Sequence, residues 1–422
     1  MLYWADMTLA EDLKARGFAE QSSAPLEEIL AAKRGVYLGM DPTADSLHVG
    51  HLVPLLLMKR LADAGHRAVF LVGGGTGMIG DPRESGERIL LDKRTLEHNK
   101  RGLRAQLQKV LGRKIEMVDN ATWLGKLSLL EFLRDTAKHF SVNELIKRDL
   151  IKRRLETPDE SISFTEFSYA LLQAYDYFTL HKKKGIDLQV GGSDQWTNIL
   201  SGIDLVRKKL GDEVYGFTWP LVTDSSGKKF GKSEGNAVWL DGKKTSPFRF
   251  YQFWMNTPDS EIEQYLKLFT FLSAEQMNTL LETHRKDPGE REGQETLARL
   301  VTEIVHGPAA TAAAAAATDV LFGGKTLADL SREERAVLLG EIETLKVPKA
   351  SLSPGYSIAD ALAEGKLASS KSDARRLIEA KGITINGKVV DTVEPTITAS
   401  DFSEGLALLR KGKKDALLLV LK

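Results

Sequence analysis

The sequence predicts an α/β fold, in which a parallel-sheet domain is followed by an α-helical domain and a small α+β domain. Two patterns support this prediction. Between about residues 36 and 221, short apolar runs alternate with longer periodic stretches, as in strands joined by crossover helices. Residues 246–322 instead carry helical patterns and no strand pattern. With 422 residues, the chain is long enough for roughly two to four domains.

The elements follow from local patterns. Four buried strands are expected at residues 35–39, 68–72, 115–118 and 186–190. The segments between them are long enough for crossovers, so the strands should run parallel. Residues 127–154 are expected to be helical. Near the C-terminal end, Ser372 should cap a helix that stops at Gly382, and Asn386-Gly387 is typical of a hairpin turn.

Composition excludes several kinds of protein. The 58 basic side chains balance 58 acidic ones, so any RNA binding must be local, and neither DNA nor a membrane is an expected partner. The absence of cysteine excludes disulfides, thiolate metal sites and cysteine nucleophiles. The most apolar run, residues 52–58, is too short to span a bilayer, and Asp6 and Glu11 are atypical of a signal peptide. We therefore expect a cytoplasmic protein.

Two glycine motifs point toward nucleotide sites but do not fit them well. Gly75, Gly77 and Gly80 satisfy G-x-G-x-x-G after an expected strand, yet Asp81-Pro82 follows at once. Proline is poorly placed there, and Asp81 would set a negative charge near a pyrophosphate, so a dinucleotide site is disfavoured. Residues 227–233 resemble a P-loop that is one residue short. This lysine-rich segment could close onto a polyphosphate or be an exposed hairpin tip.

Two histidines mark the entrance of an expected helix, in the sequence His48-Val49-Gly50-His51. Pro54 belongs in a first helical turn, which places the helix start near Gly50 or His51. Both imidazoles then lie near the positive end and can donate hydrogen bonds to an anion. Two solvated loop histidines are the alternative. A zinc pair is disfavoured because neither cysteine nor an HExxH motif accompanies them.

These motifs resemble those of a known enzyme family. His48-Val49-Gly50-His51 is similar to the HIGH signature of class I aminoacyl-tRNA synthetases, and residues 229–233 are similar to their KMSKS loop, in the same order and at a similar separation. Further stretches resemble bacterial-type tyrosyl-tRNA synthetases, namely residues 41–44, 80–82, 163–176 and 191–195. The resemblance covers essentially the whole chain. It implies a homodimer that uses L-tyrosine, ATP with Mg²⁺, and tRNA(Tyr).

A tyrosine pocket is implied on the expected helix 164–178. At about 100° per residue, Tyr169, Gln173 and Asp176 share one polar stripe. Helical geometry alone does not show whether this stripe lines a pocket or lies on a solvent-exposed surface. By resemblance, Tyr37 and Asp176 would bond the substrate phenol. The other residues implied for tyrosine are Asp41 and, near its ammonium or carboxyl group, Asp81, Tyr169, Gln173 and Gln195.

The resemblance also implies an ATP site and a reaction. Tyrosine would attack the α-phosphate of ATP to form tyrosyl-adenylate, and the tyrosyl group would then pass to tRNA. Catalysis would be electrostatic and positional, without a protein nucleophile or a dedicated metal site. The implied catalytic residues are Thr43, His48, His51, Lys229 and Lys232. The implied ATP-binding residues are Gly39, His48, Gly50, His51, Gly192, Asp194, Lys229, Lys232 and Ser233.

Two positions depart from the family pattern. Phe230-Gly231 replaces Met-Ser in the loop, a form common among tyrosyl-tRNA synthetases, and Leu38 stands where relatives often carry cysteine. Leu38 puts a ribose contact, and so the affinity for ATP, in question.

The last domain resembles a small RNA-binding module through residues 372–378 and 385–387. From residue 356 on there are eleven basic and nine acidic side chains, so bulk charge does not support RNA binding. Arg375 and Arg376 are the expected contacts to an RNA backbone.

The expected domain division follows from these assignments. It comprises a Rossmann-like catalytic domain at 1–225 with a helical insertion at about 121–165, a loop and connector at 226–245, an α-helical anticodon-region domain at 246–325, a linker at 326–354 and an RNA-binding domain at 355–422. A tryptophanyl-tRNA synthetase and a non-catalytic RNA-binding paralogue are the alternatives.

Overall fold

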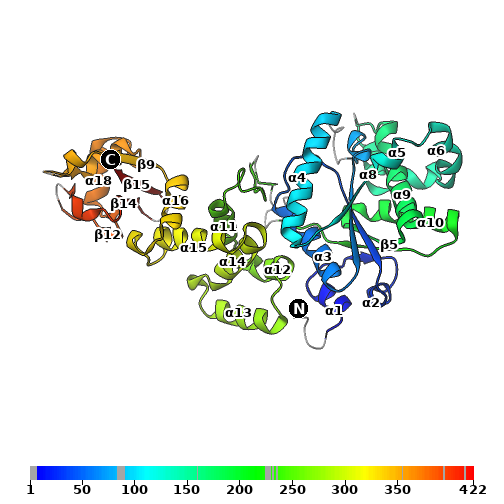
Figure 1. The fold of residues 1–422 in the computed structure, drawn as a ribbon, viewed down its shortest axis with the longest axis horizontal. Helices are drawn as coiled ribbons and strands as arrows, with labels where there is room; N and C mark the ends of the chain where they lie inside the picture. Colours follow the sequence, from blue (N-terminus) through cyan, green and yellow to red (C-terminus); the bar gives the residue numbers. More distant parts are fainter. Residues whose placement is uncertain are drawn as a thin grey trace. The chain divides into compact units, whose positions relative to one another are not determined.

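The structure is a computed structural model. It describes residues 7–82, 91–158, 160–223, 230, 232–233, 236–353, 355–392, 395–412 and 415–422. Two compact units are present (Figure 1). The first comprises Met1–Thr245 with Thr257–Leu297, and the second comprises Ser246–Asn256 with Ala298–Lys422. The five-part division expected from the sequence does not coincide with these two units, which share the expected helical domain 246–325 between them, and it stays a prediction.

The first unit is built on a six-stranded sheet in the order β1-β6-β5-β2-β3-β4. The strands are β1 (Gln21–Ser22), β2 (Gly35–Met40), β3 (Arg67–Val72), β4 (Glu116–Asp119), β5 (Ile186–Gly192) and β6 (Tyr215–Trp219). All neighbours are parallel except the edge pair β1 and β6. The α/β class and the four expected strands are confirmed. Strand order reverses between β2 and β5, so their carboxyl ends are the natural place for a ligand.

Helices cover both faces of this sheet. Helices α3 (Leu52–Asp63) and α4 (Lys93–Leu111) lie on one face, and α9 (Phe164–Lys184) and α10 (Trp196–Leu210) lie on the other (Figure 1). Helix α9 begins with a capping box between Ser163 and Glu166 and ends at Gly185 in the left-handed conformation. Outside the segment 121–156, the other helices of this unit are α1 (Leu9–Ala15), α2 (Leu26–Ala31), α12 (Asp259–Phe269), α13 (Ala274–Lys286) and the first part of α14 (Glu292–His306).

The segment expected to be helical over 127–154 is a series of short helices. After α5 (Ala121–Leu124) come α6 (Leu129–Asp135), α7 (Val142–Leu145) and α8 (Asp149–Glu156). Thr136 and Phe140 have non-helical backbone, and Ser128 starts a new helix with its own capping box. Local capping therefore divides a stretch whose composition alone predicts one long helix.

The second unit joins helices to a five-stranded sheet. Its helices are α11 (Pro247–Met255), the rest of α14, α15 (Pro308–Phe322), α16 (Arg332–Glu341), α17 (Ile358–Glu364) and α18 (Lys371–Glu379). The sheet order is β12-β11-β14-β15-β9. Its strands are β9 (Thr344–Val347), β11 (Ile383–Ile385), β12 (Lys388–Val389), β14 (Leu406–Lys411) and β15 (Asp415–Leu421), with a separate pair β10 (Tyr356–Ser357) and β13 (Thr396–Ile397).

Two local expectations in this unit need correction, and one is confirmed. The cap of α18 is Ser370, whose side chain accepts a hydrogen bond from the Asp373 N–H, so the expected cap Ser372 lies inside the helix. Strand β9 lies in the segment expected to be a linker, where it pairs in parallel with β15. The expected hairpin is present, with φ of 45° at Asn386 and 81° at Gly387. Within the described residues, no helix combines the length and apolar character that crossing a bilayer requires.

Candidate active site

A buried polar pair lies where β2 meets α9. Tyr37 is fully buried, and its hydroxyl has no hydrogen-bond partner among the residues that the structure describes. Asp176 is 1% exposed and accepts hydrogen bonds from Asn120 Nδ2 at 2.9 Å and Trp123 Nε1 at 2.6 Å. Burial raises the pKa of Tyr37 well above its usual range, and the nearby charges of Tyr177 and Asp176 add to this rise. A buried hydroxyl without a partner, beside a carboxylate, is suited to a ligand that carries its own hydroxyl.

Asn120 and Trp123 were not expected from the sequence. They follow β4 directly, at the same carboxyl edge of the sheet as the other polar residues. That position was the signal that could have identified them. Both donors favour the charged form of Asp176, but burial outweighs them and raises its pKa from 3.8 to about 7.

Replacing Asp176 with asparagine should change how stability depends on pH. Between pH 3.8 and about 7 the folded protein keeps a proton at Asp176 that the unfolded chain loses. The contribution of this group to stability is therefore fully present below pH 3.8 and is lost as pH rises toward 7. The difference between the pKa of Asp176 in the folded protein and its ordinary value corresponds to a free energy of about 4 kcal/mol.

The measurement is the free energy of unfolding in urea for both proteins, at several pH values between about 5 and 8. The wild type should lose stability relative to Asp176→Asn as pH rises through this window. Hydrogen bonds lost in the variant shift its stability by an amount that does not depend on pH. A difference that is the same at every pH would contradict the raised pKa.

A second polar network begins at Asp81. Gln195 Nε2 donates to Asp81 Oδ2 at 2.9 Å, and Asn198 Nδ2 lies 3.5 Å from Asp81 Oδ1. Asn198 Nδ2 also lies 3.3 Å from Gln173 Oε1. The structure thus brings together Asp81, Gln173 and Gln195, as the family resemblance implied, and adds Asn198 to them.

Asp41 and Tyr169 form a third contact in the same region. The Tyr169 hydroxyl donates to Asp41 Oδ2 at 3.2 Å, and the Thr76 hydroxyl donates to Asp41 Oδ1 at 3.1 Å. Burial, together with the charges of Asp41 and Asp81, raises the pKa of Tyr169 well above its usual range. Tyr169 is therefore a neutral hydrogen-bond donor at ordinary pH.

The two histidines bracket the entrance of α3, where His48 precedes a short 3₁₀ turn at Val49–His51 and His51 ends it. The ring centroids of His48 and His51 are 4.0 Å apart. Nδ1 of His48 accepts a hydrogen bond from the Gly50 N–H at 3.1 Å, and Nδ1 of His51 accepts one from the His48 N–H at 3.2 Å. Each neutral ring must then carry its proton on Nε2. Both Nε2–H groups are thereby assigned as donors.

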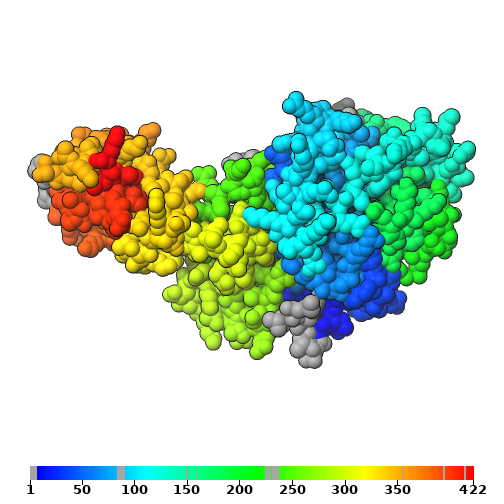
Figure 2. Space-filling view, viewed as in Figure 1, coloured from blue at the N-terminus to red at the C-terminus, as the bar shows by residue number. Residues whose placement is uncertain are grey.

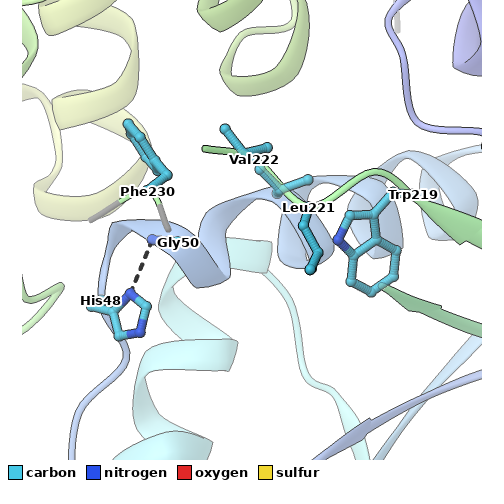
Figure 3. Close-up of a pocket in the computed structure, with 7 residues that line it drawn as sticks. His48, Gly50, Trp219, Leu221, Val222 and Phe230 are labelled. Atoms are coloured by element: carbon cyan, nitrogen blue, oxygen red, sulfur yellow. Dashed lines mark hydrogen bonds between the residues drawn. The ribbon is translucent and has the colours of Figure 1, made fainter. Parts of the chain in front are cut away.

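An open pocket of about 150 Å³ adjoins this entrance (Figure 3). Its lining residues are His48, Gly50, Val53, Trp219, Leu221, Val222 and Phe230. Phe230 comes from the lysine-rich segment, and its carbonyl oxygen would lie 3.0 Å from a Cβ placed on Gly50. A side chain at Gly50 would therefore crowd Phe230, and it would also displace the His48 ring, whose Cε1 lies 2.9 Å from the same point. The histidine entrance and Phe230 share one cavity.

Phe230 and the residues that follow the lysine-rich segment are each held by contacts with other elements. Its ring packs against Tyr265 and Phe269 of α12, with centroids 5.0 and 5.3 Å apart. Further along the chain, the Val49 N–H donates to the Val238 carbonyl at 2.9 Å, and the Leu240 N–H donates to the Leu47 carbonyl at 2.8 Å. These contacts hold the residues after the lysine-rich segment against the helix entrance.

The remaining expected residues are placed as follows. Thr43 is exposed in the loop after β2, and Gly39 lies in β2, where a Cβ would only touch Leu71 at 3.9 Å. Gly192 ends β5 and Asp194 follows it, exposed. Lys229 lies outside the described residues. Lys232 and Ser233 form strand β7 (Lys232–Ser233), paired with β8 (Asn236–Ala237), but their side chains are outside the description.

The expected RNA contacts lie in the second unit. Arg375 and Arg376 are both exposed on α18, and Arg376 Nη2 donates to Asp373 Oδ1 at 3.4 Å. Across the described part of the chain, no group of three or more His, Asp or Glu side chains is arranged to hold a metal ion.

Comparison with known proteins decides the family. Residues 31–323 match the model of tRNA synthetases class I (W and Y). The tyrosine–tRNA ligase of Leuconostoc citreum is 45% identical over 415 residues, covering 97% of this chain and 98% of the relative. The chain belongs to the tyrosyl-tRNA synthetase family. Residues 341–419 match the tyrosine–tRNA ligase SYY-like C-terminal domain. The resemblance drawn from the sequence motifs is confirmed.

Other members of the tyrosyl-tRNA synthetase family are also similar to this chain over most of its length. The tyrosine–tRNA ligase of Chromobacterium violaceum is 45% identical over 416 residues, covering 96% of this chain and 97% of the relative. Among solved structures, the truncated mitochondrial tyrosyl-tRNA synthetase of Aspergillus nidulans has a TM-score of 0.66 and 33% identity, covering 73% of this chain and 92% of that one. A tryptophanyl-tRNA synthetase from Encephalitozoon cuniculi is only 17% identical at a TM-score of 0.53, covering 72% of this chain and 88% of that one, and so shares the fold alone.

Proposed function

We propose that this chain activates L-tyrosine with ATP and then transfers the tyrosyl group to the 3′-terminal ribose of tRNA(Tyr). The observation that carries the proposal is the buried pair of Tyr37 and Asp176. Within the described part of the chain, the Tyr37 hydroxyl lacks a hydrogen-bond partner, and the Asp176 carboxylate is held by two donors, so together they suit a phenolic hydroxyl. Phenylalanine would leave both groups desolvated and unpaired.

The ammonium of tyrosine is proposed to bind between Asp81, Tyr169 and Gln173, with Asp41 adding negative charge. Gln195, at the start of α10, is proposed to face the substrate carboxyl group. This orients the carboxylate toward the pocket beside His48 and Gly50. The reaction then forms a bond between a carboxylate oxygen and the α-phosphorus of ATP, and the bond from that phosphorus to the bridging oxygen of pyrophosphate breaks.

The charge of the departing pyrophosphate is proposed to be stabilised at the helix entrance. Both Nε2–H groups of His48 and His51 can donate to phosphate oxygens, and they sit at the positive end of α3. Thr43, Lys229 and Lys232 are proposed to add further donors. The lining of the shared pocket is proposed to hold the adenine, with Gly39, Gly192, Asp194 and Ser233 along the nucleotide. Mg²⁺ is proposed to enter with ATP, bound by its phosphates.

The second step uses the terminal ribose of tRNA(Tyr). A ribose hydroxyl attacks the carbonyl carbon of the adenylate, and AMP leaves with the bonding electrons. We propose that the C-terminal domain, including Arg375 and Arg376, contacts the tRNA backbone. We also propose a cytoplasmic location, which suits a chain without cysteine.

A homodimer is proposed for the first unit. The insertion carries exposed apolar side chains, and its outer surface is visible in teal in Figure 2. Leu130 is 78% exposed and Phe164, at the start of α9, is 77% exposed. Others of this kind are Leu129, Leu133, Val142, Ile146 and Leu155. Large exposed apolar side chains gathered in one segment indicate a protein interface.

The test of the proposed function is exchange of labelled pyrophosphate into ATP, with each of the twenty amino acids in turn. Only tyrosine should support rapid exchange. Exchange that depends on another amino acid, or no exchange at all with a folded protein, would overturn the proposal.

Removing the C-terminal domain should separate the two steps. Because β9 pairs with β15, the cut must precede Thr344 so that no unpaired strand remains. Truncation after Ile342 should leave pyrophosphate exchange nearly unchanged and reduce tRNA charging by about tenfold or more, through lost phosphate contacts. Arg375→Ala combined with Arg376→Ala should reduce charging in the same direction. Full charging by the truncated chain would exclude this domain as a tRNA contact.

A further inference from the structure

Asn198 lies at the centre of the residues proposed to hold the amino-acid end of tyrosine. It is on α10 and is 8% exposed. Its Nδ2 lies 3.3 Å from Gln173 Oε1, 3.3 Å from Gln195 Oε1 and 3.5 Å from Asp81 Oδ1. One side-chain amide therefore meets an oxygen on each of three site residues.

A half-buried arginine approaches the other end of this amide. Arg148, between α7 and α8 of the insertion, donates from Nη1 to Asn198 Oδ1 at 3.3 Å. Its Nη2 donates to the Ser201 hydroxyl, which itself donates to the Thr197 carbonyl at 2.9 Å. The guanidinium group is thus held by two side chains on successive turns of α10.

The chemistry of arginine fixes the orientation of Asn198. A guanidinium group can only donate hydrogen bonds, so Asn198 must present its oxygen to Arg148. Its NH₂ group then has to face Gln173, Gln195 and Asp81. In the flipped orientation, the Asn198 oxygen would oppose three other oxygens, and its NH₂ group would oppose the guanidinium donors.

The orientation matters for the two glutamines. Because Asn198 donates toward Oε1 of both Gln173 and Gln195, their oxygens are drawn to Asn198, and Gln195 Nε2 is directed to Asp81 Oδ2 at 2.9 Å. Without Asn198, the Gln173 amide could turn over and set an N–H donor toward the substrate ammonium, whereas Gln195 stays held by Asp81 Oδ2. Asp81 would also lose its contact with Asn198.

We propose that Asn198 is a positioning residue for the amino-acid end of tyrosine, and that Arg148 acts through Asn198 by fixing its amide. The proposal rests on the proposed function, since it assigns the ammonium to Asp81 and Gln173. It gives the insertion a part in tyrosine binding that is separate from any contact with tRNA.

The test is steady-state pyrophosphate exchange with four variants. Asn198→Ala should raise the KM for tyrosine on the order of tenfold, as expected for hydrogen bonds to a charged site, and change kcat and the KM for ATP much less. Arg148→Met should act in the same direction, and Arg148→Lys, which keeps a donor, should restore most of the affinity. Thr197→Ala, an exposed neighbour on the same helix, is the matched control and should be unchanged.

Two further readouts distinguish positioning from loss of structure. The double variant Asn198→Ala/Arg148→Met should be no worse than Asn198→Ala alone, because Arg148 acts only through Asn198. Inhibition by tyramine, which keeps the ammonium, should weaken in Asn198→Ala, whereas inhibition by 3-(4-hydroxyphenyl)propionate, which lacks it, should not.

Three results would overturn the proposal: additive losses in the double variant, equal weakening of both inhibitors, or Arg148→Met affecting tRNA charging while tyrosine KM stays unchanged. The wild-type assay separates this from the proposed function. If the wild type shows no tyrosine-dependent exchange, the function has failed, whereas an active wild type with unaffected variants disproves only the role of Asn198 and Arg148.

Discussion

Asp176→Asn should lower the preference for tyrosine over phenylalanine by about 10- to 100-fold, the range expected for a lost hydrogen bond between a charged group and a buried partner. The asparagine side chain keeps the shape of Asp176 but replaces one acceptor oxygen with a donor. That NH₂ group would face either the Asn120 and Trp123 donors or the substrate hydroxyl. Binding of tyrosine therefore weakens, while phenylalanine, which has no hydroxyl, loses little.

The measurement is the ratio of kcat/KM values for the two amino acids in pyrophosphate exchange. Tyr37→Phe is the companion variant, because it removes the hydroxyl that lacks a partner. Tyr37→Phe should also lower the preference for tyrosine. Unlike Asp176→Asn, which introduces an NH₂ group, it only removes a buried hydroxyl. An unchanged ratio in Asp176→Asn would exclude Asp176 from the phenol site.

His48→Ala should reduce kcat for exchange by about 100-fold, the loss typical of removing one donor to a developing negative charge. The KM values for tyrosine and ATP should change much less, because the charge on pyrophosphate grows only in the transition state. The hydrogen bond at His48 also identifies which ring nitrogen should act. Nδ1 of His48 is occupied by the Gly50 N–H, so the catalytic donor is Nε2–H.

Two substitutions test that assignment. Glutamine carries its NH₂ group at about the position of Nε2, and asparagine carries it at about the position of Nδ1. His48→Gln should therefore retain more activity than His48→Asn. The opposite order would show that Nδ1 is the functional nitrogen. A fall in ATP affinity that equals the fall in kcat/KM would show ground-state binding instead.

The parts of the site that lie on one element could be predicted from the sequence. Tyr169, Gln173 and Asp176 are placed by helical periodicity, and Pro54 fixes the start of the helix behind His48 and His51. Helix α9 begins at Phe164 and α3 at Leu52, as these patterns predict, but α9 continues past the expected end at Phe178 to Lys184.

The contacts between distant elements could not be predicted in this way. Asn120 meets Asp176 across 56 positions, and Arg148 meets Asn198 across 50. The second pair depends on how the short helices of the insertion turn, and that depends on local caps such as Ser128 rather than on periodicity. Strand β9 was missed for a related reason, because its four residues become a strand only by pairing with β15.

The most direct test of the account is a crystal structure with tyrosine and a non-hydrolysable ATP analogue bound together. We expect the triphosphate between His48, His51 and the segment that carries Phe230, the adenine against Leu221 and Val222, and the tyrosine hydroxyl bonded to Asp176 and Tyr37. A triphosphate bound away from the pocket shared by His48, Gly50 and Phe230, or a phenol ring outside the Tyr37 and Asp176 pair, would contradict the proposed mechanism.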